Sequence, residues 1–311
     1  LHFHERGGES KDPGYRRLLI PSLLHRDQQE MSATFLMASF DKAEGSPTVK
    51  FLQMTPAIAA GIGLCSIFLC LIITKATNVD TGGLNMPYIS DTGREGGSYF
   101  VFSIFNTIAG ILLLVTYHLN NLRLWVLQQK VNGGTGHTVA RCFGIGFGAL
   151  GAVGLIVLSI VSSMMDADTH LYAAYLFFVG TIIFACVNTS LIARARAIAP
   201  PETRDQLVPK KLWALKSVVT VLIALFFVIY IPVGMAVVCD WNYNEATKLY
   251  DYTDCLETHQ LRAATQHLCV WSLLVYLMLL VEDFAPHNMV LGHHDKAGGD
   301  VVVGHPADPL S

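Results

Sequence analysis

The sequence has few charged residues. Only 14% of its 311 residues are Asp, Glu, Lys or Arg, compared with about 25% in an average soluble domain, whereas 52% are hydrophobic. The 21 basic and 24 acidic residues give a formal net charge of -3, so the chain has no global positive field and nucleic-acid binding is disfavoured. The seven cysteines form no Cys-x-x-Cys pair, which excludes a zinc ribbon and a small disulfide-rich secreted scaffold.

Motifs of catalysis are also missing. The sequence contains no Gly-x-Ser-x-Gly, no His-Glu-x-x-His and no pair of intramembrane aspartates, so we predict that the protein is not an enzyme. Asp166, Asp168 and His170 alternate in a way that could hold a metal ion, but this segment is better interpreted as a solvated turn in which Asp168 and His170 cap the next helix. We predict no bound metal and no cofactor.

What the chain does contain is six apolar runs of bilayer length. About 20 uncharged residues cover the roughly 30 Å of hydrocarbon in a membrane, and lipid offers no partners to backbone groups, so each run should be a helix. The sequence therefore predicts an all-α, polytopic membrane protein with six transmembrane helices in one bundle. The runs cover residues 55–74, 99–119, 142–165, 171–193, 218–239 and 263–281.

Small residues mark one face of the third run. Gly144 and Gly148 are four residues apart, and Gly151 and Ala152 continue the stripe. The glycines follow no strand and lie in an apolar run, so they do not form a nucleotide-binding loop. Such a face instead favours close approach of a neighbouring helix in lipid.

The distribution of Lys and Arg predicts the orientation of the bundle. Nine of these residues lie in the second and fourth loops, against four in the first, third and fifth. By the positive-inside rule the even loops and both termini are cytosolic, and the odd loops face a lumen or the outside. Residues 1–50 are then a disordered cytosolic region, 51–284 the membrane domain and 285–311 a flexible cytosolic tail. Met31 is the first methionine, so it stays open whether residues 1–30 are translated.

Two loops contain further candidate sites. Cys239 and Cys255 flank the fifth loop, where an oxidising lumen would allow a disulfide, although free thiols remain the alternative. The basic fourth loop could bind anionic phospholipids or a cytosolic adaptor, or could act only as the orientation signal. Its six basic residues are Arg194, Arg196, Arg204, Lys210, Lys211 and Lys216.

The segment Pro-Tyr-Ile-Ser-Asp-Thr-Gly at residues 87–93 follows the first helix, and it resembles the DRAM family of damage-regulated autophagy modulators. The wider superfamily includes transmembrane regulators of a phosphatidylinositol 4-kinase and a Golgi protein of GPI-anchor lipid remodelling. Single positions also match: His170, which enters the fourth helix, His259 before the sixth, and the closing Asp283-Phe284. The candidate site residues are thus Pro87, Tyr88, Ser90, Asp91, Thr92, Gly93 and His170.

The chain departs from the family pattern at two places. Residues 94–98 replace a Pro-Glu segment, and the polar pair Gln266-His267 stands where the family has Glu-Trp. Gln266 cannot ionise, so any role that needs a proton on that Glu would be lost. The resemblance therefore implies the shared six-helix fold more firmly than a shared mechanism.

The residues of the motif predict a turn. Ser90 and Asp91 can bond nearby backbone N–H groups, and Gly93 permits a positive φ. One interpretation is a lumenal loop folded back onto the bundle. The other is that Asp91 and His170 line a pocket for a lipid head group or a partner.

The resemblance implies a non-enzymatic protein that promotes or modulates autophagy at lysosomal or endosomal membranes, with the lipid bilayer as its first partner. The alternatives are a plasma-membrane scaffold that regulates a phosphatidylinositol 4-kinase, and a factor of GPI-anchor lipid remodelling in the Golgi.

Overall fold

The structure, a computed structural model, describes residues 46–237, 242–244 and 248–285. Six helices in this part of the chain are long and apolar enough to cross a membrane, so the prediction of an all-α polytopic fold is confirmed. They are α2 (Pro47–Ala76), α4 (Gly96–Lys130), α5 (Thr135–Ile160), α6 (Ala167–Ile198), α8 with its continuation (Lys210–Ala236) and α10 (Leu256–Asp283). The short elements are α3 (Ile89–Thr92), α7 (Arg204–Leu207), a 3-10 turn (Thr253–Cys255) and the antiparallel strands β1 (Asn242–Asn244) and β2 (Leu249–Asp251).

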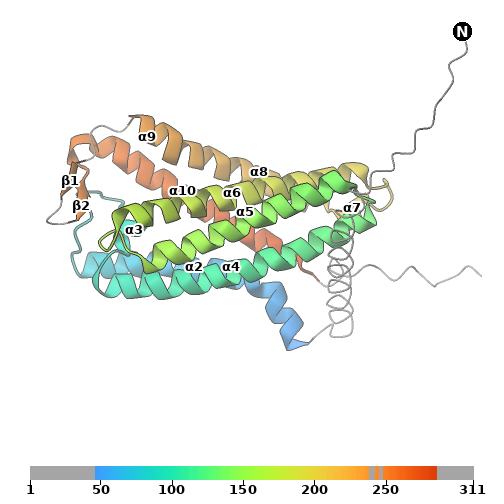
Figure 1. Ribbon diagram of the computed structural model, residues 1–311, viewed down its shortest axis with the longest axis horizontal. Helices are drawn as coiled ribbons and strands as arrows, with labels where there is room; N and C mark the ends of the chain where they lie inside the picture. The colour runs from blue at the N-terminus through green and yellow to red at the C-terminus, as the bar shows by residue number, and fades with distance from the viewer. Residues whose placement is uncertain (1–45, 238–241, 245–247, 286–311) are drawn as a thin grey trace, which may run out of the picture.

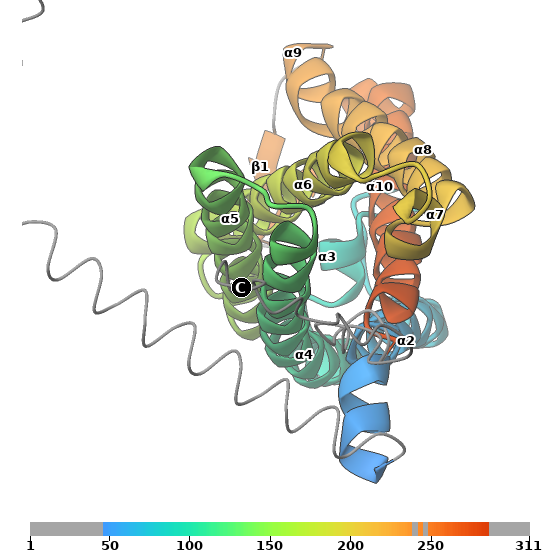
Figure 2. The same cartoon turned by 90° about the vertical axis from the view of Figure 1, so that its right-hand side faces the viewer.

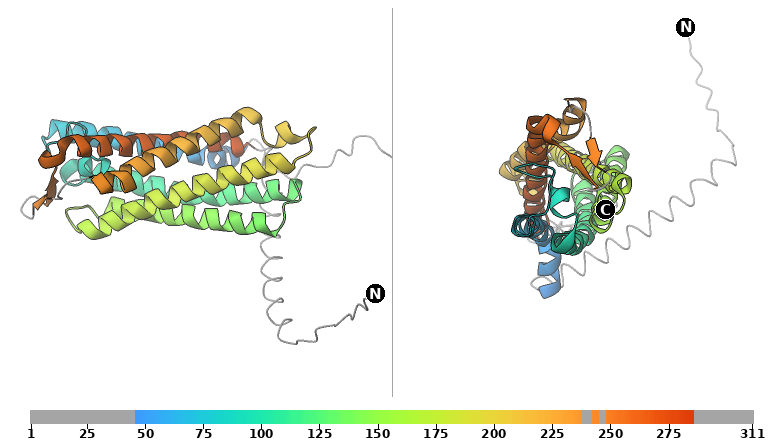
Figure 3. Two further views of the ribbon diagram at one scale, coloured as in Figure 1. Left: turned by 90° about the horizontal axis from the view of Figure 1, so that it is seen from above. Right: turned by 90° about the vertical axis from the view of Figure 1, so that its left-hand side faces the viewer.

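The six long helices form a closed ring. Each packs against the next in sequence, and α10 closes the ring by packing against α2. Seen along the bundle, the helices surround α3, which lies inside one end of the ring (Figure 2). We call this the α3 end; it also carries the β1–β2 hairpin, whereas α7 lies at the opposite, α7 end (Figures 1 and 3). The charge pattern predicts that the α3 end faces the lumen.

Two helix ends differ from the sequence prediction between residues 160 and 170. Helix α5 ends at Ile160, five residues before the apolar run does, because the chain turns at residues 162–165. Helix α6 is capped by Asp166, whose carboxylate accepts the Thr169 N–H at 3.1 Å. The prediction that Asp168 and His170 cap this helix is therefore wrong.

The fifth span is not a continuous α-helix. Helix α8 ends at Val228 and a π-helical segment, Ile229–Val233, leads into α9 (Gly234–Val237). Pro232 lies inside the π segment. A proline has no N–H to donate and its ring collides with the preceding turn, which explains why the regular hydrogen-bond pattern widens here.

The small-residue face of α5 packs directly on α6. A Cβ added to Gly151 would lie 2.9 Å from the Thr181 nitrogen, and one added to Gly154 would lie 2.6 Å from the Phe177 nitrogen. These neighbours are backbone atoms that cannot rotate away. The structure thus confirms that the glycines allow two helices to approach closely.

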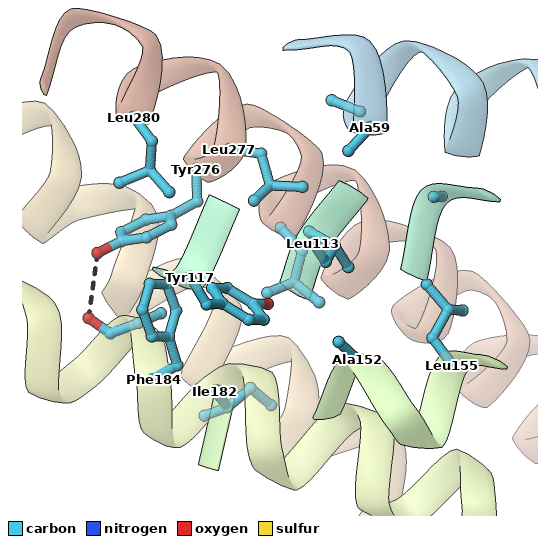
Figure 4. Packing of buried hydrophobic residues seen from close by; sticks show 14 of the residues in the cluster. Ala59, Leu113, Tyr117, Ala152, Leu155, Ile182, Phe184, Tyr276, Leu277 and Leu280 are labelled. Atoms are coloured by element: carbon cyan, nitrogen blue, oxygen red, sulfur yellow. Dashed lines mark hydrogen bonds between the residues drawn. The ribbon is translucent and has the colours of Figure 1, made fainter. Parts of the chain in front are cut away.

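Aromatic side chains fill the middle of the ring. The rings of Tyr117 and Phe184 lie 4.3 Å apart between their centroids, and Tyr276 meets Phe184 edge-on (Figure 4). Asn188 joins three helices beside them, since its Nδ2 donates to the Tyr276 hydroxyl at 2.7 Å and its Oδ1 accepts from Asn120 at 3.1 Å. A polar group in the bundle is in this way satisfied by its neighbours.

Candidate functional site

The motif segment forms α3 and not the predicted turn with a left-handed glycine. Gly93 has a φ of -106°, so the expectation of a positive φ is wrong. Glycine is required for space instead, because a Cβ at this position would lie 2.3 Å from the Phe102 ring. Thr92 anchors the segment to α2, since its carbonyl accepts the Thr74 hydroxyl at 2.8 Å.

Helix α10 holds α3 in the ring through side chains that bond its backbone. Gln266 Oε1 accepts the Ile89 N–H at 2.8 Å, and His267 Nε2 donates to the Pro87 carbonyl at 3.1 Å. Each contact is long-range: the two partners are 177 positions apart in sequence in the first contact and 180 positions apart in the second. The polar pair that departs from the family pattern therefore has a structural role, and this role needs an amide and an imidazole but no carboxylate.

Asp91 is the buried acid of the site. Its carboxylate does not bond the local backbone, as the sequence suggested, but accepts the Tyr252 hydroxyl at 3.1 Å. Burial raises the pKa of Asp91 from 3.8 to about 6, although the Tyr252 hydrogen bond and the positive charge of Arg94 lower it. Burial and the neighbouring Asp91 raise the pKa of Tyr252, so its hydroxyl keeps the proton that it donates.

Aromatic rings and one cation complete the cluster. The Tyr88 hydroxyl lies 3.0 Å from His259 Nδ1, and burial raises the pKa of Tyr88. The guanidinium carbon of Arg262 lies 5.7 Å from the Tyr88 ring centroid and 5.8 Å from that of Tyr230, within the range of cation–π attraction. The Tyr230 hydroxyl accepts the Gln266 amide at 2.8 Å.

Most of this cluster, including Tyr88, Asp91 and Arg262, lines a cavity of about 360 Å³ inside the ring. The wall includes both Asp91 and His170, the two residues that one of the two interpretations of the motif assigned to a pocket. It continues along α4, α6 and α10 past Leu113 and Phe178 to Tyr276. The volume falls within the 300–1,000 Å³ typical of small-molecule sites.

His170 enters the cavity wall from the first turn of α6. Its Nδ1 lies 2.7 Å from the Val161 carbonyl oxygen, and its side chain is largely buried. Its Nε2 is buried and has no hydrogen-bond partner among the described residues. Ser90, by contrast, lines the cavity while only half-buried.

The other predicted sites have different outcomes. Cys255 is disulfide-bonded, whereas Cys239 lies outside the described residues. In the fourth loop, Lys210, Lys211 and Arg194 are exposed and remain candidates for contact with anionic lipid. Two others are engaged locally: Arg196 pairs with Asp205 at 2.6 Å, and Arg204 Nη2 donates to the Ala199 carbonyl at 3.3 Å.

Lys216 departs from the prediction that it contacts lipid from the fourth loop. It lies in α8 with only 1% of its side chain exposed, and its ammonium binds the carboxylate of Asp283. Arg123 Nη2 binds the other oxygen of Asp283 at 3.0 Å. Two cations from α4 and α8 thus share one buried carboxylate at the end of α10. This ion triad was not foreseen, because the three residues are far apart in sequence.

A family model described as the Frag1/DRAM/Sfk1/Cwh43P N-terminal domain matches residues 51–287. The chain belongs to this family. No curated protein and no solved structure matches it. The matched residues include the α3 motif, all the residues that line the cavity and the three residues of the ion triad. The cluster and the ion triad therefore lie within the Frag1/DRAM/Sfk1 domain.

Within this Frag1/DRAM/Sfk1 domain, sequence reasoning had missed Tyr230, Tyr252 and Arg262. They contact the motif from the π segment, from the residue after β2 and from α10, more than 130 residues away. No local pattern marks them. The only available signal was the presence of aromatic and basic residues beside the fifth loop, and that signal is common at membrane boundaries.

Proposed function

We propose that this Frag1/DRAM/Sfk1 protein is a non-catalytic membrane protein that modulates autophagy from lysosomal or endosomal membranes. The observation that carries the proposal is the burial of Asp91, the acid of the family motif, in the wall of a cavity at the α3 end. The charge pattern predicts that this end faces the lumen.

The surroundings of Asp91 favour an acidic compartment. The groups facing it are the hydroxyl of Tyr252, the cation of Arg94 and the phenols of Tyr88 and Tyr230. With a pKa of about 6, raised by burial, the carboxyl is mostly charged at neutral pH and mostly neutral in the acidic lumen of late endosomes and lysosomes. A group that changes charge between these conditions would let the wall of the cavity respond to the compartment.

A cellular experiment tests the function directly. The protein, tagged and produced at native level in cells that lack the endogenous copy, should colocalise with lysosomal or endosomal markers and restore autophagic flux. Asp91→Asn should reach the same membranes but alter flux, because its side chain can no longer change charge. Asp168→Asn is the matched control, since Asp168 is exposed at the same end. Unchanged flux with Asp91→Asn in a normally localised protein would contradict the proposal.

One observation favours a second function. Lys210, Lys211 and Arg194 are exposed near the α7 end and could bind the anionic inner leaflet of the plasma membrane, each contributing about 1 kcal/mol. This would suit a scaffold that regulates a phosphatidylinositol 4-kinase. An exclusive plasma-membrane location would favour that function. An altered lipid composition of GPI-anchored proteins after gene deletion would instead favour GPI-anchor remodelling.

Topology can be tested separately by inserting a glycosylation acceptor into the loop between α9 and α10. We expect modification there and none between α6 and α8. The reverse result would invert the orientation and place the Asp91 cluster in the cytosol.

A further inference from the structure

The hydrogen-bond geometry of His170 fixes the position of its proton. Nδ1 lies 2.7 Å from the carbonyl oxygen of Val161, and a carbonyl oxygen can only accept. Nδ1 therefore carries the proton and donates it to this bond. In the neutral ring, Nε2 then has a free lone pair and can only accept.

This acceptor has no hydrogen-bond partner among the described residues, and its residue belongs to the cavity wall. His170 lines the cavity and is only 7% exposed, and its Nε2 is unpartnered among the described residues. A buried acceptor without a donor costs about 1–3 kcal/mol. The site is thus complete only when a donor, an O–H or N–H group, enters the cavity next to Nε2.

The rest of the wall fits hydrocarbon. Apolar side chains such as Leu113 and Phe178 dominate the lining. The deeper polar side chains of Asn106 and Thr181 already bond within the protein, to Ser66 and to the Phe177 carbonyl. Hydrocarbon placed here would leave water at roughly 25 cal/mol for each Å² of apolar surface buried.

The charged groups of the cavity wall are already engaged. Asp91 accepts the Tyr252 hydroxyl. Arg262 Nε donates to the Tyr230 carbonyl at 3.2 Å, and the Lys248 ammonium donates to the Met164 carbonyl at 3.2 Å. A ligand therefore needs no charge to complete the site.

A route for a lipid also exists. Three residues of the wall are exposed on the surface: Leu171 at the start of α6, Met235 of α9 and Lys248 before β2. Two of these are apolar, so the cavity reaches the surface beside positions that suit the hydrocarbon of the bilayer.

We propose that the cavity binds an uncharged, hydroxyl-bearing lipid, with its hydrocarbon between α4, α6 and α10 and its O–H donating a hydrogen bond to Nε2 of His170. A linear monoacylglycerol and a sterol share this chemistry. Binding of such a lipid does not depend on the compartment proposed above.

Photolabelling of the purified full-length chain tests this site. The chain is placed in phosphatidylcholine nanodiscs, because this lipid has no O–H or N–H donor. Two probes carry a diazirine in the same position of a hexadecyl chain, one ending in a hydroxyl and the other in its methyl ether. We expect saturable labelling of peptides that line the cavity, with about two- to tenfold tighter binding of the alcohol, which corresponds to one net hydrogen bond.

Variants separate the hydrogen bond from the cavity. His170→Ala should bind the alcohol and the ether equally, whereas His118→Ala, which removes an exposed histidine of α4, should keep the preference. Ala174→Phe, which fills the cavity wall, should remove saturable labelling by both probes. Competition by unlabelled monooleoylglycerol or by cholesterol distinguishes a linear ligand from a sterol.

Equal affinity for the alcohol and the ether in the unmodified chain would overturn the proposal, because a water molecule would then satisfy Nε2. Labelling that does not saturate, or that Ala174→Phe leaves unchanged, would also overturn it. If His170→Ala fails to fold, the alcohol-to-ether ratio of the unmodified chain still decides the outcome.

Discussion

Replacing Asp283 with Asn would leave two buried cations without their shared counter-ion. The carboxylate binds Arg123 and Lys216 with its two oxygens, and its side chain is only 1% exposed. An Asn of the same shape keeps the packing but supplies no negative charge. The change therefore isolates the electrostatic contribution of the ion triad.

The size of the effect follows from the geometry. Two unit charges 3.0 Å apart, the distance from Arg123 Nη2 to Asp283 Oδ1, attract by about 5 kcal/mol at an effective dielectric constant of about 20. The cost of removing the charges from water offsets part of this attraction. Measured losses on breaking one side of a buried ion pair are about 3–5 kcal/mol. At about 2–4 °C per kcal/mol for a domain of this size, we expect Tm to fall by about 6–20 °C.

The buried cysteines provide the assay. Cys70 and Cys269 are fully buried free thiols, whereas Cys65 and Cys142 are exposed. Blocking the exposed thiols first and then heating with a thiol-reactive fluorophore reports unfolding as the buried thiols become accessible. The measurement needs no engineered cysteine, because both reporting thiols are native.

A control variant on the same helix shows how large a loss of Tm has to be before it is assigned to the ion triad. Glu257→Gln neutralises an exposed acid on the same helix and should shift the free energy of unfolding by less than about 1 kcal/mol. If Asp283→Asn lowers Tm no more than Glu257→Gln does, the ion triad is not a stabilising contact and the reasoning fails.

Three further predictions concern other parts of the fold. Gly154→Ala should lower Tm by several degrees, at a cost of about 1–3 kcal/mol, because the new methyl group meets the backbone of α6, whereas Gly146→Ala, which meets nothing, should not lower Tm. The pKa of Asp91 is raised from 3.8 to about 6, so the folded state binds the proton more tightly. Stability should therefore fall by about 2 kcal/mol as pH rises from 4 to 7, and Asp91→Asn should remove this part of the pH dependence of Tm. Non-reducing peptide mapping should join Cys239 to Cys255, and separate peptides without reduction would contradict this pairing.

The membrane-spanning helices could be predicted from the sequence because a single segment in lipid can satisfy its backbone hydrogen bonds only as a helix. The glycine face of α5 could also be predicted, since the need for close approach is visible in residue size. The irregular end of the fifth span could not be predicted. Hydropathy alone does not show that Pro232 shifts the chain into a π segment.

The motif illustrates a different limit. Its composition indicated a turn, but the segment is a helix because α10 supplies the partners of its backbone, Gln266 for the Ile89 N–H and His267 for the Pro87 carbonyl. The positive-inside rule likewise counted Lys216 as a loop residue, although Asp283 holds it within the bundle. In both cases the deciding contact is long-range, and a single sequence does not encode it in any local pattern.

The closed ring sets the order in which the protein can be completed. During synthesis α3 is made long before α10, and until α10 follows, the Ile89 amide and the Pro87 carbonyl lack their partners. The same last helix closes the ring against α2 and brings the carboxylate that Arg123 and Lys216 require. A chain that stops before residue 256 would therefore expose open helix faces and unpaired cations to the surveillance machinery of the membrane. Helix α10 therefore completes the ring, the hydrogen bonds of the α3 segment and the ion triad in a single step.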